Sequence, residues 1–188
     1  MAFTVPDLHD DRVALRPPTR ADVPAITDAV QDPDIPRFTM VPSPYGEADA
    51  VAYVESAAQA WRDGSRCSFL VVGWVGDELL GSVGIHHLDR EASTAEIGYW
   101  VAAPARGAGV ATRGLRLAAG WALTDLGLAR LEAHVFTDNP RSRRVAEAAG
   151  FVCRGRCATP VGHPSGPREA WRLVRTAADP GPRVERRR

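Results

Sequence analysis

The chain has 188 residues, of which 45% are hydrophobic, and it carries 23 basic and 23 acidic side chains. This length fits one domain with a proper core, and the balanced charge provides no overall field that attracts nucleic acid or an anionic membrane. No apolar run approaches the roughly 20 residues that cross a bilayer, and the first residues lack the basic and apolar regions of a signal peptide. We therefore expect a cytoplasmic protein that binds neither nucleic acid nor membrane.

The first half of the chain is predicted to contain two helices and three strands. In chain order we expect a strand at 13–17, a helix to about 30, a loop at 35–45, a helix at 47–62 and strands at 67–75 and 78–88. Thr19 and Asp22 have the spacing of a capping box at the first helix, and Gly64 is placed to end the second. Three prolines between 35 and 45 favour a loop there.

The second half is predicted to continue the sheet and to add two helices. We expect a strand at 94–102, a helix from 110 to about 127, a strand at 129–136, a helix at 140–149, a strand at 151–154, a loop at 155–168 and a last strand at 170–174. This order predicts an α+β fold, an antiparallel meander leading into a parallel pair, with helices on both faces of a mixed sheet. We expect one domain over 1–175 and a disordered tail, rich in Pro, Gly and Arg, over 176–188.

A loop with two glycines, Gly107 and Gly109, lies between the strand expected at 94–102 and the helix expected from Val110. Glycine lets the backbone turn tightly and approach a ligand closely, and a helix N-terminus offers free N–H groups that favour an anion. Arg106 adds a permanent positive charge. The loop is neither a dinucleotide fingerprint nor a Walker loop, so it predicts phosphate binding of another kind. A tight turn without a ligand is the alternative that spacing alone leaves open.

The cysteines and the paired histidines show no metal-binding pattern. Cys67, Cys153 and Cys157 are an odd number at spacings that match neither a zinc site nor a disulfide framework, so we expect reduced thiols. His86 and His87 fall within an expected strand, where neighbouring side chains face opposite sides. We therefore expect that they cannot bind one metal ion together, and we predict no metal site.

Three segments resemble motifs of one enzyme family, in the same order along the chain. Residues 106–111 (Arg-Gly-Ala-Gly-Val-Ala) resemble the element with which GCN5-related N-acetyltransferases (GNAT) hold the pyrophosphate of acetyl-coenzyme A (acetyl-CoA). Residues 96–101 (Glu-Ile-Gly-Tyr-Trp-Val) and the motifs within 138–151 are similar to the RimJ/RimL branch, which acetylates ribosomal-protein N-termini. The resemblance runs from near Leu15 to about Arg175 and implies the GNAT fold, in which strands corresponding to 94–102 and 129–136 splay apart to receive pantetheine.

The resemblance also implies that acetyl-CoA is the co-substrate. The residues expected to contact it are Trp100, Val101, Arg106, Gly107, Ala108, Gly109, Val110, Ala111, Thr112, Asn139 and Arg143. The backbone N–H of Trp100 or Val101 is expected to stabilise the carbonyl oxygen from a bulge in the strand. Arg141, Arg143 and Arg144 are candidates for the 3′-phosphate, with solvent-exposed arginines as the alternative.

Two residues are predicted to move protons. Glu96 is a poor β-former inside a strand that otherwise looks buried, so its carboxylate is expected to face a cavity and accept the proton of the amine. A structural carboxylate paired with arginine or facing solvent is the alternative. Ser142, in the first turn of the helix that Asn139 and Pro140 begin, is the candidate proton donor to the thiolate. The resemblance implies a tyrosine of the equivalent helix as the other common donor, and this helix contains no tyrosine. The alternative is a serine that only satisfies backbone N–H groups.

We therefore predict an N-acetyltransferase whose acceptor is a protein N-terminal α-amine. The alternatives are a small amine such as an aminoglycoside or a polyamine, and a longer acyl donor such as succinyl-CoA. A strongly acidic acceptor groove would favour the polycation. A further alternative, of a different class, is a CoA-binding sensor without turnover. Dimerisation is a family-level expectation only.

Overall fold

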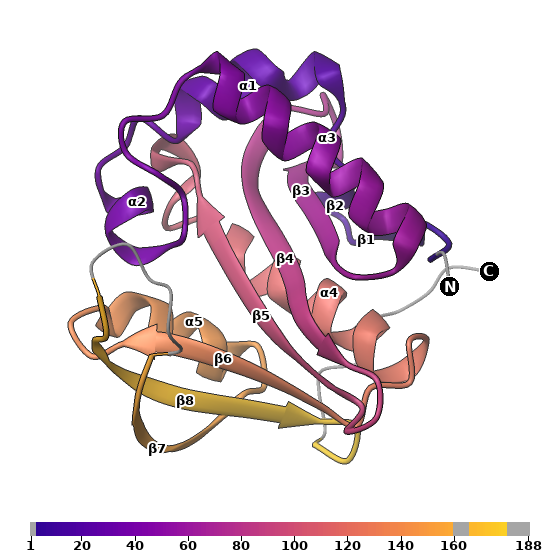
Figure 1. Ribbon diagram of the computed structural model, residues 1–188, viewed down its shortest axis with the longest axis vertical. Helices are drawn as coiled ribbons and strands as arrows, with labels where there is room; N and C mark the ends of the chain where they lie inside the picture. The colour runs from indigo at the N-terminus through magenta and orange to yellow at the C-terminus, as the bar shows by residue number, and fades with distance from the viewer. Residues whose placement is uncertain (1–2, 160–165, 180–188) are drawn as a thin grey trace.

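The computed structural model describes residues 3–159 and 166–179. Its elements are β1 (Leu8–His9), β2 (Val13–Arg16), η1 (Arg20–Asp22), α1 (Val23–Ala29), α2 (Asp34–Phe38), α3 (Glu47–Asp63), β3 (Cys67–Gly73), β4 (Leu79–Asp89), β5 (Thr94–Val101), η2 (Ala103–Ala105), α4 (Val110–Thr124), β6 (Arg130–Phe136), α5 (Pro140–Ala148), β7 (Val152–Ala158) and β8 (Glu169–Thr176). The strands form one sheet in the order β1-β2-β3-β4-β5-β6-β8-β7 (Figure 1).

The sheet is mixed and mostly antiparallel, as predicted. Strands β1 to β5 pair antiparallel in chain order, β5 and β6 pair parallel, and β8 lies antiparallel between β6 and β7. A parallel neighbour requires a crossover, which α4 supplies between β5 and β6. The crossover begins at the glycine loop, so the topology places that loop at the end of β5.

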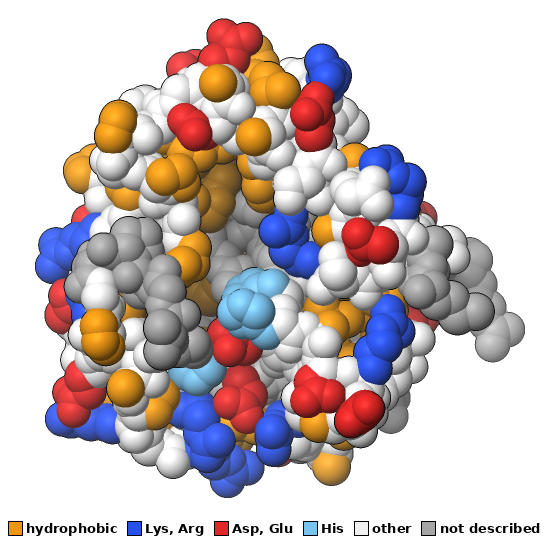
Figure 2. Space-filling model, viewed as in Figure 1, with side chains coloured by type: hydrophobic (Ala, Val, Ile, Leu, Met, Phe, Trp, Pro, Cys, Tyr) orange, Lys and Arg blue, Asp and Glu red, His pale blue; other side chains and the backbone are white. Residues whose placement is uncertain are grey.

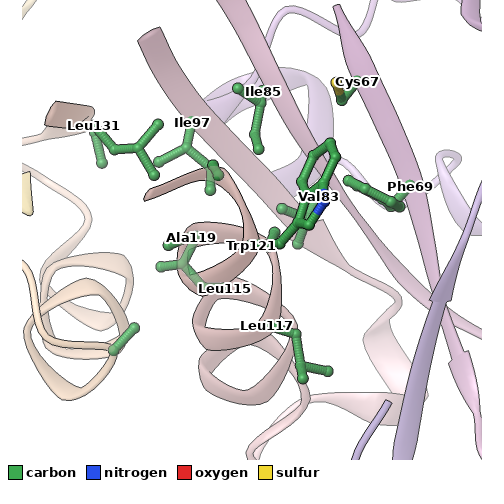
Figure 3. Close-up of a cluster of buried hydrophobic side chains, with 14 of the residues drawn as sticks. Cys67, Phe69, Val83, Ile85, Ile97, Leu115, Leu117, Ala119, Trp121 and Leu131 are labelled. Atoms are coloured by element: carbon green, nitrogen blue, oxygen red, sulfur yellow. The ribbon is translucent and has the colours of Figure 1, made fainter. Parts of the chain in front are cut away.

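Helices cover both faces of the sheet (Figure 1). On one face, Leu115 and Trp121 of α4 pack among buried side chains of the central strands, including Phe69, Val83 and Ile85 (Figure 3). On the other face a smaller core joins side chains of α1 and α3 to β3, namely Ile26, Val54, Leu70 and Val72. Because apolar side chains anchor the central strands on both faces, β5 is held firmly where the candidate site lies.

Several local predictions are confirmed. Thr19 and Asp22 form the capping box before α1, and α3 ends at Gly64, whose φ of 72° is the left-handed conformation that glycine favours. The helix predicted from 110 is α4, and it buries Leu115, Ala118, Ala119 and Ala122, which are spaced three or four residues apart or adjacent on one face. The patterns that repeat over a whole helix or strand therefore identify these elements correctly.

Three segments differ from the prediction. Part of the loop expected at 35–45 is the helix α2, because Ile35 is buried and Pro36 falls in the first turn, where its missing N–H costs nothing. Strand β1 was not expected. Strand β7 continues to Ala158, through a register shift between Cys153 and Arg156 that accommodates Gly155 at a φ of 117°.

The described chain continues past the predicted domain end, since Thr176 ends β8 and its backbone N–H donates to the Asp179 carboxylate. The rest of the predicted disordered tail, 180–188, lies outside the described residues. Among the residues that the structure describes, no helix combines the length and the hydrophobicity needed to cross a bilayer.

Candidate active site

Strands β5 and β6 separate after three paired positions. Thr94, Ala95 and Glu96 pair with Arg130, Leu131 and Glu132, and no pairing continues towards Val101 within the described strands. A pocket of about 660 Å³ opens at the separated ends. Its walls come from α2, the end of β5, the glycine loop with the start of α4, and the start of α5: Asp34, Ile35, Phe38, Thr39, Tyr99, Trp100, Val101, Ala105, Arg106, Gly107, Gly109, Val110, Ala111, Thr112, Asp138, Asn139, Pro140, Arg141, Ser142 and Val145.

The glycine loop forms one end of this pocket. Gly107 and Gly109 have φ values of 82° and 79°, in the left-handed region that favours glycine. Gly109 is the N-cap of α4, and no side chain caps that helix. The first-turn N–H groups of Val110 and Ala111 are therefore left for solvent or a ligand. This arrangement suits an anion at the start of α4.

Arg106 lines the pocket but its charge is not free. Its guanidinium lies 2.9 Å from Asp32 Oδ1 and 3.5 Å from Asp34 Oδ2, and its Nε donates to the carbonyl of Val101 at 3.2 Å. These contacts tie the glycine loop to the α1–α2 segment. In this conformation, Arg106 closes the side of the pocket and leaves the backbone amides as its main anion-binding groups.

The backbone of β5 identifies which amide faces the gap. The N–H of Ala102 donates to Leu80 of β4 at 2.9 Å, so the alternation of a strand turns the N–H of Val101 away from β4, towards the separated edge. The bulge expected at Trp100–Val101 is wrong, because the pairing runs without a shift from Gly81↔Val101 to His86↔Glu96. The free amide comes from strand separation rather than from a bulge.

Ser142 lies in the pocket beside a residue that the sequence interpretation missed. The hydroxyl of Tyr99 donates to the carbonyl of Ser142 at 2.9 Å and lies 2.7 Å from Ser142 Oγ. Burial raises the pKa of Tyr99 to about 12, so the phenol stays protonated at neutral pH. Helix α5 lacks a tyrosine, and β5 brings one to its first turn instead. The sequence did contain a signal for this contact. Side chains alternate along β5, so Tyr99 and Glu96 point to opposite faces of the strand.

The other residues expected in α5 divide into two groups. Asn139 is the N-cap, its side chain accepts the N–H of Ser142 at 3.1 Å, and it lines the pocket with Arg141. Arg143 does not line the pocket, because it pairs with Glu147 at 2.8 Å and stacks over the ring of Trp171. The structure therefore brings Asn139 and Arg141 to the pocket and turns Arg143 towards β8.

Glu96 lies on the opposite face of β5 from Tyr99 and outside the pocket lining. It shares its face with Trp100, about 13 Å further along the strand at 3.3 Å per residue. Its carboxylate is three-quarters buried and lies 3.4 Å from His134 Nδ1 and 3.3 Å from His87 Nδ1, with no arginine in an ion pair with it among the described residues. The neighbouring His134 lowers the pKa of Glu96, against the opposing effect of burial, so this carboxylate is ionised at neutral pH.

The expectation that His86 and His87 face opposite sides is wrong. His87 has a φ of 50°, and the pairing of β4 with β5 shifts register between His86 and Asp89. This irregularity turns both rings to one side, where their Nδ1 atoms are 3.3 Å apart. Burial and the adjacent His87 lower the pKa of His86 to about 4. Figure 2 shows histidine and acidic side chains gathered at the lower edge of a hollow in this face.

Residues 12–152 match the profile of the acetyltransferase (GNAT) domain. The uncharacterized N-acetyltransferase YoaA of Bacillus subtilis (strain 168) is 27% identical over 150 residues, which cover 80% of this chain and 85% of that protein. The ribosomal-protein-serine acetyltransferase of Escherichia coli (strain K12) is 32% identical over 79 residues, which cover 42% of this chain and 44% of that protein.

Solved structures share the fold. Mycobacterium smegmatis RimJ in complex with CoA-disulfide superimposes with a TM-score of 0.80 over 92% of this chain and 87% of that chain. The two sequences are 23% identical over this alignment. At this sequence identity the structural similarity shows only a shared fold. The chemistry has to be inferred from the side chains and backbone amides described above.

Proposed function

Because the chain belongs to the acetyltransferase (GNAT) family and is an acetyltransferase, we propose that it transfers the acetyl group of acetyl-CoA to the N-terminal α-amine of a protein. The observation that carries this proposal is one pocket that joins the glycine loop, the uncapped start of α4 and the unpaired edge of β5. An anion site and a row of free strand amides are what a phosphorylated, peptide-like carrier requires.

The residues of the pocket fit acetyl-CoA. A Cβ built at Gly107 or Gly109 meets no described atom within 4 Å, so open space lies beside the amides where a pyrophosphate would bind. The proposed contacts are the backbone of Gly107 and of 109–112 for the pyrophosphate, the edge of β5 at Trp100 and Val101 for pantetheine, and Asn139 and Arg141 beside them. Ala108, also expected from the sequence, does not line the pocket. Acetyl-CoA would supply an activated thioester, so the protein has to position an amine and manage charge.

Glu96 is the proposed base. Its ionised carboxylate attracts a protonated amine and accepts its proton through a chain of water molecules, because Glu96 is five residues, about 16 Å, from Val101 along β5. The N–H of Val101 is the proposed donor to the carbonyl oxygen as that oxygen gains charge, because this amide faces the unpaired edge of β5. Glu96 and Val101 lie on one rigid strand, which fixes the geometry between proton removal and oxyanion stabilisation.

Ser142 and Tyr99 together are the proposed source of the proton for the leaving thiolate. The Ser142 hydroxyl lines the pocket and is 2.7 Å from the hydroxyl of Tyr99. After Ser142 gives its proton to the sulfur, the Tyr99 O–H turns from the Ser142 carbonyl to the Ser142 oxygen and replaces that proton. The phenol of Tyr99 is then restored from solvent after the product leaves.

The charges around Glu96 favour an acceptor with a single positively charged amine over a polycation. Glu132 is paired opposite Glu96 across β5 and β6, and its carboxylate lies 3.0 Å from Arg130 and 3.7 Å from Arg172. His87 and His134 flank Glu96 itself. A spermidine or aminoglycoside acceptor needs several unpaired carboxylates, and the acceptor face does not provide such a cluster within the described residues. We therefore favour a protein N-terminus over these small amines.

The test is release of free thiol from acetyl-CoA with a panel of acceptors. Peptides carrying the N-termini of ribosomal proteins are compared with the same peptides blocked by an N-formyl group, and with spermidine and kanamycin. We expect thiol release with the free N-terminal peptides and none with the blocked peptides, even where they retain lysine side chains.

Two outcomes would contradict the proposal. Faster turnover of spermidine or kanamycin than of every peptide would identify a small-molecule acetyltransferase. CoA binding, measured by calorimetry, without thiol release on any acceptor would favour a CoA-binding sensor. Acetyl-CoA and succinyl-CoA are assayed in parallel, and the faster donor identifies the acyl group.

A further inference from the structure

We propose that His86, His87 and Glu96 form a binding site for a divalent transition-metal ion of the zinc type. Each offers one ligand atom, and these atoms all lie within 4.8 Å of one another. The three residues come from adjacent strands, with His86 paired directly opposite Glu96. The site lies outside the pocket proposed for acetyl-CoA.

The distances match those between ligands of one tetrahedral ion. Zinc binds histidine nitrogen at about 2.0–2.1 Å, so two ligands of one tetrahedral zinc are about 3.4 Å apart. The Nδ1 atoms of His86 and His87 are 3.3 Å apart, and His87 Nδ1 is 3.3 Å from Glu96 Oε1. Two edges of the tetrahedron are thus present, and a small rotation of Glu96 or His86 completes the third.

The backbone of β4 creates this cluster. A regular strand would send His86 and His87 to opposite faces, and the left-handed conformation of His87 prevents that. Only a few per cent of non-glycine residues have a positive φ. The register shift that accompanies it re-aims the His87 ring towards Glu96, which is a common use of a bulge beside a functional site.

The donor set selects the kind of ion. Two imidazoles and one carboxylate suit zinc, nickel or copper, whereas magnesium and calcium prefer oxygen ligands throughout. His134 Nδ1 lies 3.4 Å from the second oxygen of Glu96, so His134 is placed to orient the carboxylate from the side away from the ion. In the described structure this nitrogen forms no hydrogen bond of regular geometry. The side chain of His87 is 69% exposed, which gives the ion an entry path.

Occupation of this site has a functional consequence. The ion takes up the carboxylate that the proposed mechanism uses as its base, so zinc should inhibit acetyl transfer reversibly. This consequence rests on the proposed function, whereas metal binding does not. The two are therefore measured separately.

The binding experiment is a calorimetric titration of ZnCl₂ into the metal-free full-length protein, without CoA. We expect one site per chain. His87→Asn removes an imidazole but retains a residue type that tolerates a positive φ, and it should weaken zinc binding at least tenfold. His9→Ala is the matched control, because it removes a histidine of β1 that stacks on Trp74. Its zinc affinity should equal that of the unaltered protein.

Unchanged affinity in His87→Asn, equal losses in His87→Asn and His9→Ala, or no binding at all would each overturn the site. In those cases a hydrogen bond between His86 and His87 accounts for their contact. Circular dichroism of both variants checks folding. In the activity arm, zinc should slow thiol release by the unaltered protein and EDTA should restore it. Zinc that binds to the expected residues without inhibiting would support the site and remove Glu96 as the base.

Discussion

At the scale of single residues, a substitution at Glu96 should affect acetyl transfer without affecting CoA binding. Glu96→Gln keeps the shape of the side chain but removes the charge, so we expect turnover to fall by a factor on the order of 10²–10⁴. CoA affinity should stay unchanged, because Glu96 does not line the pocket. Thiol release and calorimetric titration with CoA measure the two quantities.

Glu132→Gln is the matched control for Glu96. Glu132 pairs with Glu96 across β5 and β6 and is similarly buried, but its partners are Arg130 and Arg172. Turnover within about threefold of the unaltered enzyme is expected. An equal fall in both variants would mean that general acidity of this face, rather than Glu96 as a base, supports catalysis.

Tyr99→Phe tests the other side of the reaction. The change removes only the hydroxyl that lies 2.7 Å from Ser142 Oγ, so turnover should fall about tenfold or more while the buried ring keeps its packing. The pH dependence of thiol release is the measurement that distinguishes a proton role from a packing role. Near-normal turnover over the whole pH range would exclude Tyr99 and leave Ser142 without a proton source in the described pocket.

At the scale of elements, α4 should determine CoA binding through Gly109. Gly109→Val places a branched side chain in the open space beside the first-turn amides, and we expect CoA binding to be lost in calorimetry. Gly127→Val is the matched control, because Gly127 also has a left-handed φ, 70°, and follows the other end of α4. Both changes carry similar backbone strain, and only the first should affect CoA. Unchanged CoA affinity in Gly109→Val would refute the loop assignment.

Helices and strands could be predicted from the sequence where a residue pattern repeats along the whole element. Parts of the candidate active site could be predicted where their residues lie close together in the sequence. The helix α4 and the cap at Gly64 each depend on residues close together in the sequence, and both predictions are confirmed. Tyr99 and Ser142 are 43 positions apart, so their contact depends on how α5 docks against β5. The left-handed backbone of His87 depends on the register of two strands, and the preference of histidine for a positive φ is too weak to predict it at this position. The docking of a helix against a distant strand and the register between two strands cannot be predicted from the local sequence.

At the scale of the whole molecule, Asp22 connects the N-terminal segment to the sheet. Its carboxylate accepts two hydrogen bonds from Arg16 of β2, at 2.9 and 2.8 Å, and one from the N–H of Thr19. Burial raises the pKa of Asp22, but these hydrogen bonds outweigh it, and the net pKa lies below the ordinary 3.8. A carboxyl group whose pKa is lowered by folding stabilises the folded state above its unfolded pKa, and this stabilisation is lost as the pH falls through the folded value.

Asp22→Asn should therefore lower the free energy of unfolding at pH 7 by about 2 kcal/mol, since it removes charge-assisted hydrogen bonds and half of a capping box. Urea denaturation from pH 7 to pH 2 should show a constant difference down to about pH 4 and a shrinking one below it. Asp77→Asn is the control, because Asp77 pairs with the same Arg16 but is 64% exposed, and a surface ion pair contributes about 0–1 kcal/mol. A difference that persists undiminished at pH 2 would show that Asp22 acts through packing, and the link between helix α1 and β2 would not be electrostatic.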